Sequence, residues 1–197
     1  MTDHPTTHNV LRSRRIATPP DHAYPWFVRL IYALQRRKYG AELESGRLWG
    51  RLPRTFLLLT LLYRSIDRKG SPIDPALRSL AQVRVSQINS CGFCVDLNSG
   101  AALERGLEPA KLAALAGWER SRAFDEREKA VLAYAEAATH PARRVDDACF
   151  ARLRAFLDED AVLELSALIA FQNLASKFNA ALALPVQGLC AVREDMR

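Results

Sequence analysis

Two cysteines three residues apart, Cys91 and Cys94, are the residues of this sequence whose type and spacing could do chemistry. A spacing of three places both sulfurs on one face of a helix, where they can close a small disulfide with little change in the backbone. A thiol in the first turn of a helix also has a lowered pKa, because the free N–H groups and the helix dipole stabilise the reactive thiolate. Asn89 or Ser90 is a good N-cap, so we predict that Cys91 lies in that first turn and is the more acidic thiol.

Three interpretations of this pair are open on the residues alone: a redox dithiol, a zinc site, and two small buried side chains without chemistry. A zinc site needs four ligands, and outside the pair only Cys149, Cys190 and His140 remain, with no second close pair. We take the redox dithiol as the leading hypothesis and expect neither a metal nor another cofactor.

The segments that carry these residues are predicted to be helical. Residues 56–66 are apolar nearly all round, which indicates a buried helix, and Asp74 followed by Pro75 is typical of a helix start. Asp125 and Glu128 predict a capping box. Apolar spacing, caps and breakers together predict helices over residues 24–39, 53–66, 75–89, 90–105, 109–116, 126–139, 147–157 and 159–182. No segment alternates as a strand does, so the predicted fold class is all-α.

Length and composition indicate one globular domain of 197 residues, 49% hydrophobic and 25% charged. We expect residues 1–20 to form a flexible N-terminal arm, and residues 21–197 to form one multi-helical bundle with its core at 50–190. The longest uncharged apolar run of interest, residues 55–63, is shorter than the about 20 residues that cross a bilayer. The N-terminus lacks the apolar core of a secretory signal. We therefore expect a cytoplasmic protein with no membrane partner.

The net charge of +6 is carried by residues 1–78, because the remainder of the chain is slightly acidic. A basic part could steer acidic partners or ligands toward the protein. Nucleic acid would be one such partner, but the arginines are scattered among apolar residues and no recognition motif is present. We expect no nucleic-acid partner.

Beyond the cysteine pair, the sequence resembles the carboxymuconolactone decarboxylase / alkylhydroperoxidase D-like superfamily. Residues 83–89 leading into 91–96 (VRVSQIN, then CGFCVD) resemble its signature helix pair, and residues 125–135 and 164–182 resemble two later helices. The likeness covers roughly residues 50–190. It implies an all-α fold in homo-oligomers, often trimers or hexamers, and thiol peroxidase or disulfide reductase chemistry for members with this cysteine pair.

The resemblance also implies a role for each cysteine. In the family scheme the second cysteine, here Cys94, meets the peroxide and becomes a sulfenic acid, and the first, here Cys91, resolves it as a disulfide. A dithiol donor, such as a lipoyl-bearing protein, then restores the pair. The expected partners are a peroxide or another small molecule, that protein reductant, and further copies of the chain.

Two positions depart from the family pattern. The peroxidase members have a Glu twelve residues before the first cysteine, where this chain has Ser79, and a His four residues after the second, where it has Asn98. Ser and Asn cannot act as bases near pH 7, and loss of a general base costs roughly 10²–10⁴ in rate. The argument from the helix end then shifts the nucleophile from Cys94 toward Cys91. We keep Ser79, Asn98 and also Gln87, one turn before Cys91, as candidate supporting residues.

The leading hypothesis is a thiol-dependent peroxidase or disulfide oxidoreductase whose dithiol reduces hydroperoxides. A non-catalytic oligomeric scaffold or ligand-binding protein with a decayed site is the first alternative, and Ser79 and Asn98 favour it. A lactone decarboxylase is the second, although that branch of the superfamily generally lacks the cysteine pair. Activity that survives loss of both cysteines would argue against the redox hypothesis.

Overall fold

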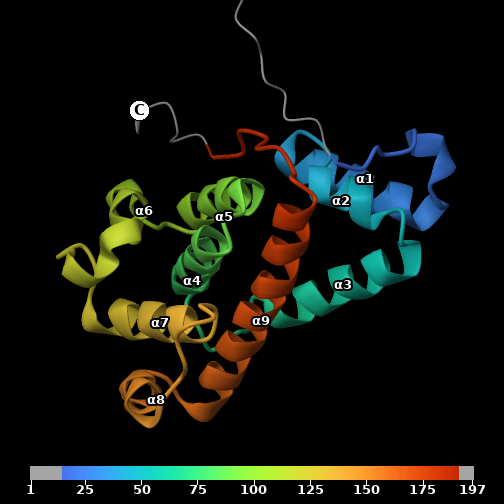
Figure 1. Cartoon of the computed structure of the whole chain (residues 1–197). Coiled ribbons are helices and arrows are strands. Elements are labelled where there is room, and N and C mark those ends of the chain that lie inside the picture. The colour runs from blue at the N-terminus through green and yellow to red at the C-terminus, as the bar shows by residue number, and fades with distance from the viewer. Residues whose placement is uncertain (1–14, 191–197) are drawn as a thin grey trace, which may run out of the picture.

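Helices make up every regular element between residues 15 and 190, the residues that this computed structural model describes (Figure 1). The prediction of an all-α fold is confirmed for this part of the chain, and none of its helices is long and apolar enough to cross a membrane. In chain order the elements are the 3-10 turn η1 (Asp21–Ala23), α1 (Trp26–Tyr39), α2 (Glu44–Trp49), α3 (Pro53–Ile66), α4 (Pro75–Ile88), α5 (Gly92–Glu104), α6 (Pro109–Ala114), the 3-10 turn η2 (Leu115–Arg120), α7 (Glu126–Ala137), α8 (Asp147–Arg154) and α9 (Glu159–Ala181).

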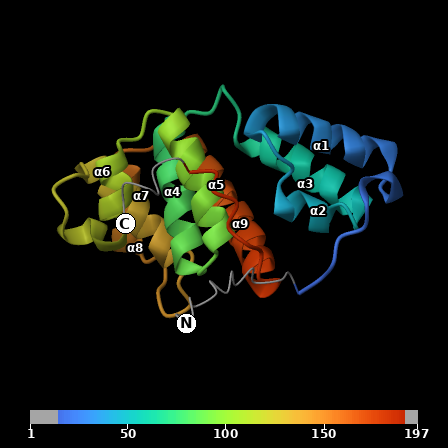
Figure 2. The same ribbon diagram turned by 90° about the horizontal axis from the view of Figure 1, so that it is seen from above.

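The helices form two groups, with the long helix α9 between them (Figure 2). Helices α1, α2 and α3 make the smaller group. In the larger group α4 packs against α5, α7 and α9, and α3 reaches across to α9 from the smaller one. The cysteine pair lies at the turn between α4 and α5, and this arrangement brings that turn against the C-terminal half of α9.

Local signals account for where most helices begin and end. Gly40 ends α1 in the left-handed conformation, with φ +75°, as its missing side chain allows. The Asp74 carboxylate accepts the N–H groups of the first turn of α4, and the capping box of Asp125 and Glu128 is present at α7. The short elements η1 and α2 escaped the sequence prediction because they carry too few turns for a periodic pattern.

Three apolar clusters hold these helices together. The largest lies among α4, α5, α7, α8 and α9, and a small one packs α1 against α3. The third joins the two groups, and its buried members are Leu43, Leu48, Cys91, Phe93, Cys94 and Leu184. The cysteine pair is thus part of the apolar contact between the two groups.

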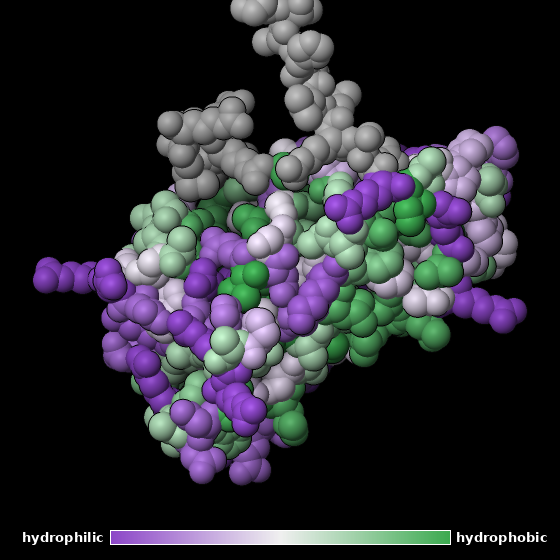
Figure 3. Space-filling view, in the orientation of Figure 1, coloured by the Kyte–Doolittle hydropathy of each residue, from purple (hydrophilic) through white to green (hydrophobic). Residues whose placement is uncertain are grey.

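The sequence prediction that residues 56–66 form a helix buried on all sides is wrong for the single chain. Only Phe56 of α3 is buried, and Leu58 keeps 66% of its surface exposed. Apolar side chains gather over α3 on the face that Figure 3 shows. The exposed members of this surface, the α3 face, are Leu57, Leu58, Leu61 and Leu62. A helix of the smaller group has too few neighbours to cover it on every side.

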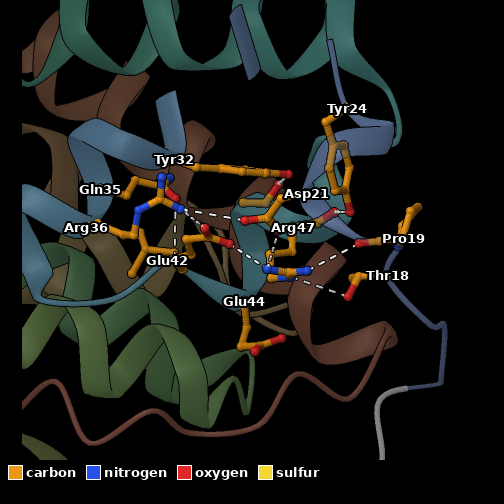
Figure 4. A network of polar contacts seen from close by, with 12 residues as sticks. Thr18, Pro19, Asp21, Tyr24, Tyr32, Gln35, Arg36, Glu42, Glu44 and Arg47 are labelled. Atoms are coloured by element: carbon orange, nitrogen blue, oxygen red, sulfur yellow. Dashed lines mark hydrogen bonds and ion pairs between the residues drawn. The ribbon is translucent and has the colours of Figure 1, made fainter. Parts of the chain in front are cut away.

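The expected N-terminal arm, residues 1–20, lies largely outside the described residues. Its described part, 15–20, makes hydrogen bonds to the rest of the domain. Arg47 of α2 donates to the Thr18 hydroxyl and the Pro19 carbonyl, and Arg51 donates to the Ala17 carbonyl. Figure 4 shows Arg47 reaching from α2 to Thr18 and Pro19 of this segment. Residues 15–20 are therefore attached to the domain.

Candidate active site

The cysteine pair lies where the chain turns from α4 into α5. Ser90 adopts the left-handed conformation, with φ +53°, and the backbone N–H of Cys91 bonds the Ser86 carbonyl at 3.0 Å. This turn makes Cys91 itself the N-cap of α5, so its sulfur accepts the backbone N–H of Cys94 at 3.3 Å. The prediction that Asn89 or Ser90 caps the helix is wrong, because the left-handed residue moves the helix start past them.

The two sulfurs form a buried, reduced dithiol. The Sγ atoms of Cys91 and Cys94 lie 2.7 Å apart, and the two residues are 2% and 3% exposed. Because the sulfurs already face each other, a disulfide can form between them without rearranging the helix. Among residues 15–190 no three His, Cys, Asp or Glu side chains are grouped as metal ligands would be.

The surroundings of the two sulfurs push their pKa values in opposite directions. The hydrogen bond between the two side chains lowers the pKa of Cys91, helped by the backbone N–H groups of Phe93 and Cys94 and opposed by burial. The hydrogen bond to Cys91, burial and repulsion by a thiolate at Cys91 raise the pKa of Cys94. Cys91 is therefore the more acidic thiol of the pair and Cys94 the less acidic one.

Two amide side chains of α9 favour the ionised form of Cys94. The Nδ2 of Asn179 donates to it at 3.2 Å, and a hydrogen bond from Gln172 also favours its ionised form. Both residues are buried. An amide can stabilise a thiolate as it forms, but it cannot take up the proton. Sequence reasoning placed neither residue in the site, because each is about 80 positions from the cysteines.

Ser86 connects Gln172 to α5. Its hydroxyl accepts the side-chain N–H of Asn98 at 3.1 Å and that of Gln172 at 3.0 Å, and donates to the Gln82 carbonyl at 2.7 Å. Asn98, at the position of the family's His, is therefore joined to Gln172 through Ser86. Of the three candidate supporting residues, it is the one that shares a hydrogen-bond network with a contact of Cys94.

Ser79 and Gln87 lie in other networks. The Gln87 Oε1 accepts from Arg84 at 3.0 Å, and the Ser79 hydroxyl accepts from Arg105 at 3.1 Å. Arg105 also bonds the buried carboxylate of Asp67 at 2.6 Å. The position of the family's Glu thus belongs here to a buried ion cluster. Neither residue has a hydrogen bond to the cysteines in the described structure.

A cavity of about 460 Å³ opens beside Cys91. Cys91 is one of its lining residues, whereas Cys94 is not. Most of the remaining wall is apolar and comes from the end of α9 and the segment after it, namely Ala180, Ala183, Leu184, Pro185 and Val186. Arg15, Ser90 and Asn179 complete its polar part. The volume is within the range of small-molecule sites.

A buried carboxylate holds the segment that directly follows the cavity wall. Asp96 of α5 is fully buried and accepts the backbone N–H groups of Gln187, Leu189 and Cys190, each at 3.0 Å. Gly100 allows the close approach, because a Cβ there would lie 2.6 Å from the Leu189 carbonyl oxygen. Asp96 lies two residues after Cys94. Sequence reasoning missed this residue because nothing in the sequence shows that the aspartate is buried.

Comparisons with known proteins match the helices that carry the site. The model of the carboxymuconolactone decarboxylase family matches residues 53–137, from the start of α3 to the end of α7. The chain is 43% identical over 176 residues to the protein YnjA of Escherichia coli (strain K12), which covers 89% of this chain and 97% of that one.

Two solved structures share the fold. A peroxidase-related protein from Ralstonia eutropha JMP134, described as an alkylhydroperoxidase AhpD core, has a TM-score of 0.82 at 18% identity, covering 91% of this chain and 95% of its own. A cysteine variant of the debrominase Bmp8 in complex with 2,3,4-tribromopyrrole has a TM-score of 0.81 at 20% identity, covering 94% of this chain and 100% of its own.

Proposed function

This chain belongs to the carboxymuconolactone decarboxylase family, and we propose that within it the chain is a thiol-dependent peroxidase whose Cys91–Cys94 dithiol reduces organic hydroperoxides. The observation that carries the proposal is the place of Cys91. It lines the 460 Å³ cavity, while the sulfur of Cys94 lies 2.7 Å from its own. A substrate in the cavity therefore meets Cys91 first.

In the first step the Cys91 thiolate attacks the terminal oxygen of the hydroperoxide. The S–O bond forms as the O–O bond breaks, and the alcohol leaves after taking the proton of the Cys94 thiol. Cys91 is oxidised to the sulfenic acid. The lowered pKa of Cys91 supports this assignment, because the thiolate is the nucleophile. It reverses the roles that the family scheme gives to the two cysteines.

In the second step the thiolate left at Cys94 attacks the sulfur of Cys91. The S–S bond forms and hydroxide leaves, which a solvent proton converts to water. The amides of Asn179 and Gln172 stabilise the Cys94 thiolate in place of the family's missing Glu and His. Over both steps one hydroperoxide and the dithiol yield one alcohol, one water and the disulfide.

A dithiol protein of the lipoyl type would reduce the Cys91–Cys94 disulfide by exchange, becoming a disulfide itself. Such a cycle needs a compartment that keeps thiols reduced, which agrees with the expected cytoplasmic location.

A test uses the reduced protein, cumene hydroperoxide and dihydrolipoamide, with disulfide formation followed by mass spectrometry. We expect Cys91→Ser to abolish oxidation, Cys94→Ser to stop at a sulfenic acid that dimedone traps, and the control Cys149→Ser to behave as wild type. Oxidation of Cys91→Ser but not of Cys94→Ser would return the nucleophile to Cys94. A wild-type protein that no peroxide oxidises would favour the scaffold alternative.

Reductive dehalogenation is a second candidate, favoured by the likeness to the debrominase Bmp8 and by the mostly apolar wall beside the dithiol. An aryl bromide would be reduced to the arene as the dithiol becomes the disulfide and bromide leaves. Bromide released from 2,3,4-tribromopyrrole by the wild type, but not by Cys91→Ser, would distinguish this activity from peroxide reduction.

We also infer a homo-oligomer, the state that the family resemblance implies. The α3 face exposes four leucines on neighbouring turns, and Leu58 is 66% exposed. Large exposed apolar patches of this kind mark surfaces through which proteins interact. A second copy of the chain that covers this face would supply the burial that the sequence predicts for α3.

A further inference from the structure

We propose that Arg15 makes the dithiol site selective for anionic substrates, namely organic hydroperoxides with an apolar body and a carboxylate. This inference names the substrate class of the site and rests on the proposed peroxidase function. It starts from the cavity beside Cys91, to which Arg15 contributes a positively charged side chain.

Arg15 is held at the cavity by the end of α9. Its Nη1 donates to the Ala181 carbonyl at 2.9 Å, and its backbone N–H bonds the Leu182 carbonyl at 3.5 Å. Ala17, two residues later, is attached as well, because Arg51 donates to its carbonyl at 3.0 Å. A carbonyl at a helix C-terminus attracts a cation. The position of the guanidinium is therefore set by the fold before any ligand enters.

The charge of Arg15 has no acidic counterpart in the cavity wall. Of the described lining residues none is Asp or Glu. A guanidinium carries five N–H donors, so it can bind a carboxylate in a bidentate manner while it keeps the bond to Ala181. Arg15 would also offset the repulsion between an anionic substrate and Cys91 when that thiol ionises to react.

Asn179 supplies a second polar contact in the same cavity. Its Nδ2 binds the sulfur of Cys94, while its buried Oδ1 has no hydrogen-bond partner in the described structure. An unpaired buried acceptor is costly, and a donor on a ligand would satisfy it. The O–H of a hydroperoxide is such a donor. It would hold the peroxide beside the sulfurs while the carboxylate lies at Arg15.

Alkylation of Cys91 tests the anion preference without using peroxide. The rates with iodoacetate, which is anionic, and iodoacetamide, which is neutral, are measured on the wild type, Arg15→Gln and Arg15→Lys. We expect Arg15→Gln to lower the iodoacetate-to-iodoacetamide ratio about two- to fivefold, the range of a partly exposed ion pair. Arg15→Lys keeps the charge and should retain the wild-type ratio. Arg37→Gln, an exposed site on α1 outside the cavity wall, is the charge-matched control.

A substrate pair tests the same preference in turnover. Linoleic acid hydroperoxide and its methyl ester carry the same reacting group and differ in the carboxylate. We expect the wild type to prefer the acid in kcat/KM and Arg15→Gln to lose that preference through KM. The neutral ester should be turned over equally by both.

The two experiments separate the two claims. Ratios that do not change in Arg15→Gln, together with equal use of acid and ester by the wild type, would overturn the role of Arg15 even if the protein is a peroxidase. An alkylation ratio that depends on Arg15 in a protein that turns over no hydroperoxide would overturn the peroxidase function and leave anion recognition standing.

Discussion

The Nδ2 of Asn179 donates a hydrogen bond to the Sγ of Cys94 at 3.2 Å, across 85 positions of the sequence. The contact joins the end of α9 to the first turn of α5. It supplies a hydrogen-bond donor to the cysteine whose own pKa is raised. This chain lacks the family's Glu and His. Asn179 nevertheless stabilises the thiolate of Cys94 that forms the disulfide.

Asn179→Ala removes this donor and is expected to slow disulfide closure. A hydrogen bond to a charged group contributes about 1.5–3 kcal/mol, which corresponds to a loss of about 10- to 150-fold. Rapid-quench trapping with dimedone should show that the sulfenic acid, once formed, persists longer than in the wild type. Asn173→Ala is the control, since Asn173 lies on the same helix and contacts Asn89 and Thr139 instead. Equal rates of closure in the wild type and Asn179→Ala would assign the asparagine to packing alone.

Cys94→Ala is expected to raise the pKa of Cys91 toward the free-thiol value of about 8.5, because the thiol that bonds the thiolate is lost. In the wild type, alkylation by iodoacetamide should reach half its maximal rate at a lower pH than in this variant. The measurement is the pH profile of the alkylation rate. Identical profiles would show that the Cys94 side chain does not contribute to the pKa of Cys91.

Asp67→Asn is expected to destabilise the protein by about 3–5 kcal/mol at pH 7, because it leaves the guanidinium groups of Arg78 and Arg105 without their buried carboxylate. Urea unfolding measures the loss. The exposed Asp160, at the start of α9, provides the control Asp160→Asn, with a change of about 0.5 kcal/mol or less.

The same substitution has a defined pH dependence. Burial alone would raise the pKa of Asp67, but the hydrogen bonds from Arg105 and Tyr63 outweigh it and hold the pKa below its ordinary value. A depressed pKa stabilises the folded state above the unfolded value of about 3.9, and this stability is lost as pH falls through the folded pKa. The difference in the free energy of unfolding between the wild type and Asp67→Asn should therefore become smaller below about pH 4. A difference that stays constant from pH 7 to pH 3 would show that the carboxylate of Asp67 does not have a lowered pKa in the folded protein.

Ala183→Gly is expected to stabilise the protein by about 0.5–1 kcal/mol, because Ala183 adopts a left-handed conformation with φ +52° that glycine adopts without strain. Thermal unfolding should show an increase of a few degrees. Ala180, one turn earlier and inside α9, gives the matched control: Ala180→Gly should cost about 1 kcal/mol, as glycine does in a helix. A decrease for both variants would mean that the Ala183 methyl packs against the cavity more strongly than its backbone is strained.

Leu58→Glu is expected to dissociate a homo-oligomer that forms through the α3 face, because it places a charge in the middle of the apolar contact. Light scattering coupled to size exclusion measures the mass at several concentrations. Phe150→Glu, at an exposed aromatic residue of α8, should leave the mass unchanged. A wild-type protein that is monomeric at all concentrations would show that a single chain keeps this face exposed.

The sequence by itself determined the features that depend on neighbouring residues. The caps at Asp74 and Asp125, the left-handed end at Gly40 and the spacing of Cys91 and Cys94 all act within one or two helical turns, so the pattern of residue types is sufficient to predict them. Helix type and family follow from the same local information.

Only the tertiary structure decided what surrounds the dithiol. Arg15, Asp96 and Asn179 come from the N-terminal segment, α5 and α9, and their contacts exist because α9 packs beside the turn at Ser90. The left-handed turn placed Cys91 at the N-cap, and the small size of the first helix group left the α3 face exposed. Such contacts join segments far apart in the chain, and their geometry depends on the packing of whole helices, which residue spacing along the sequence does not encode.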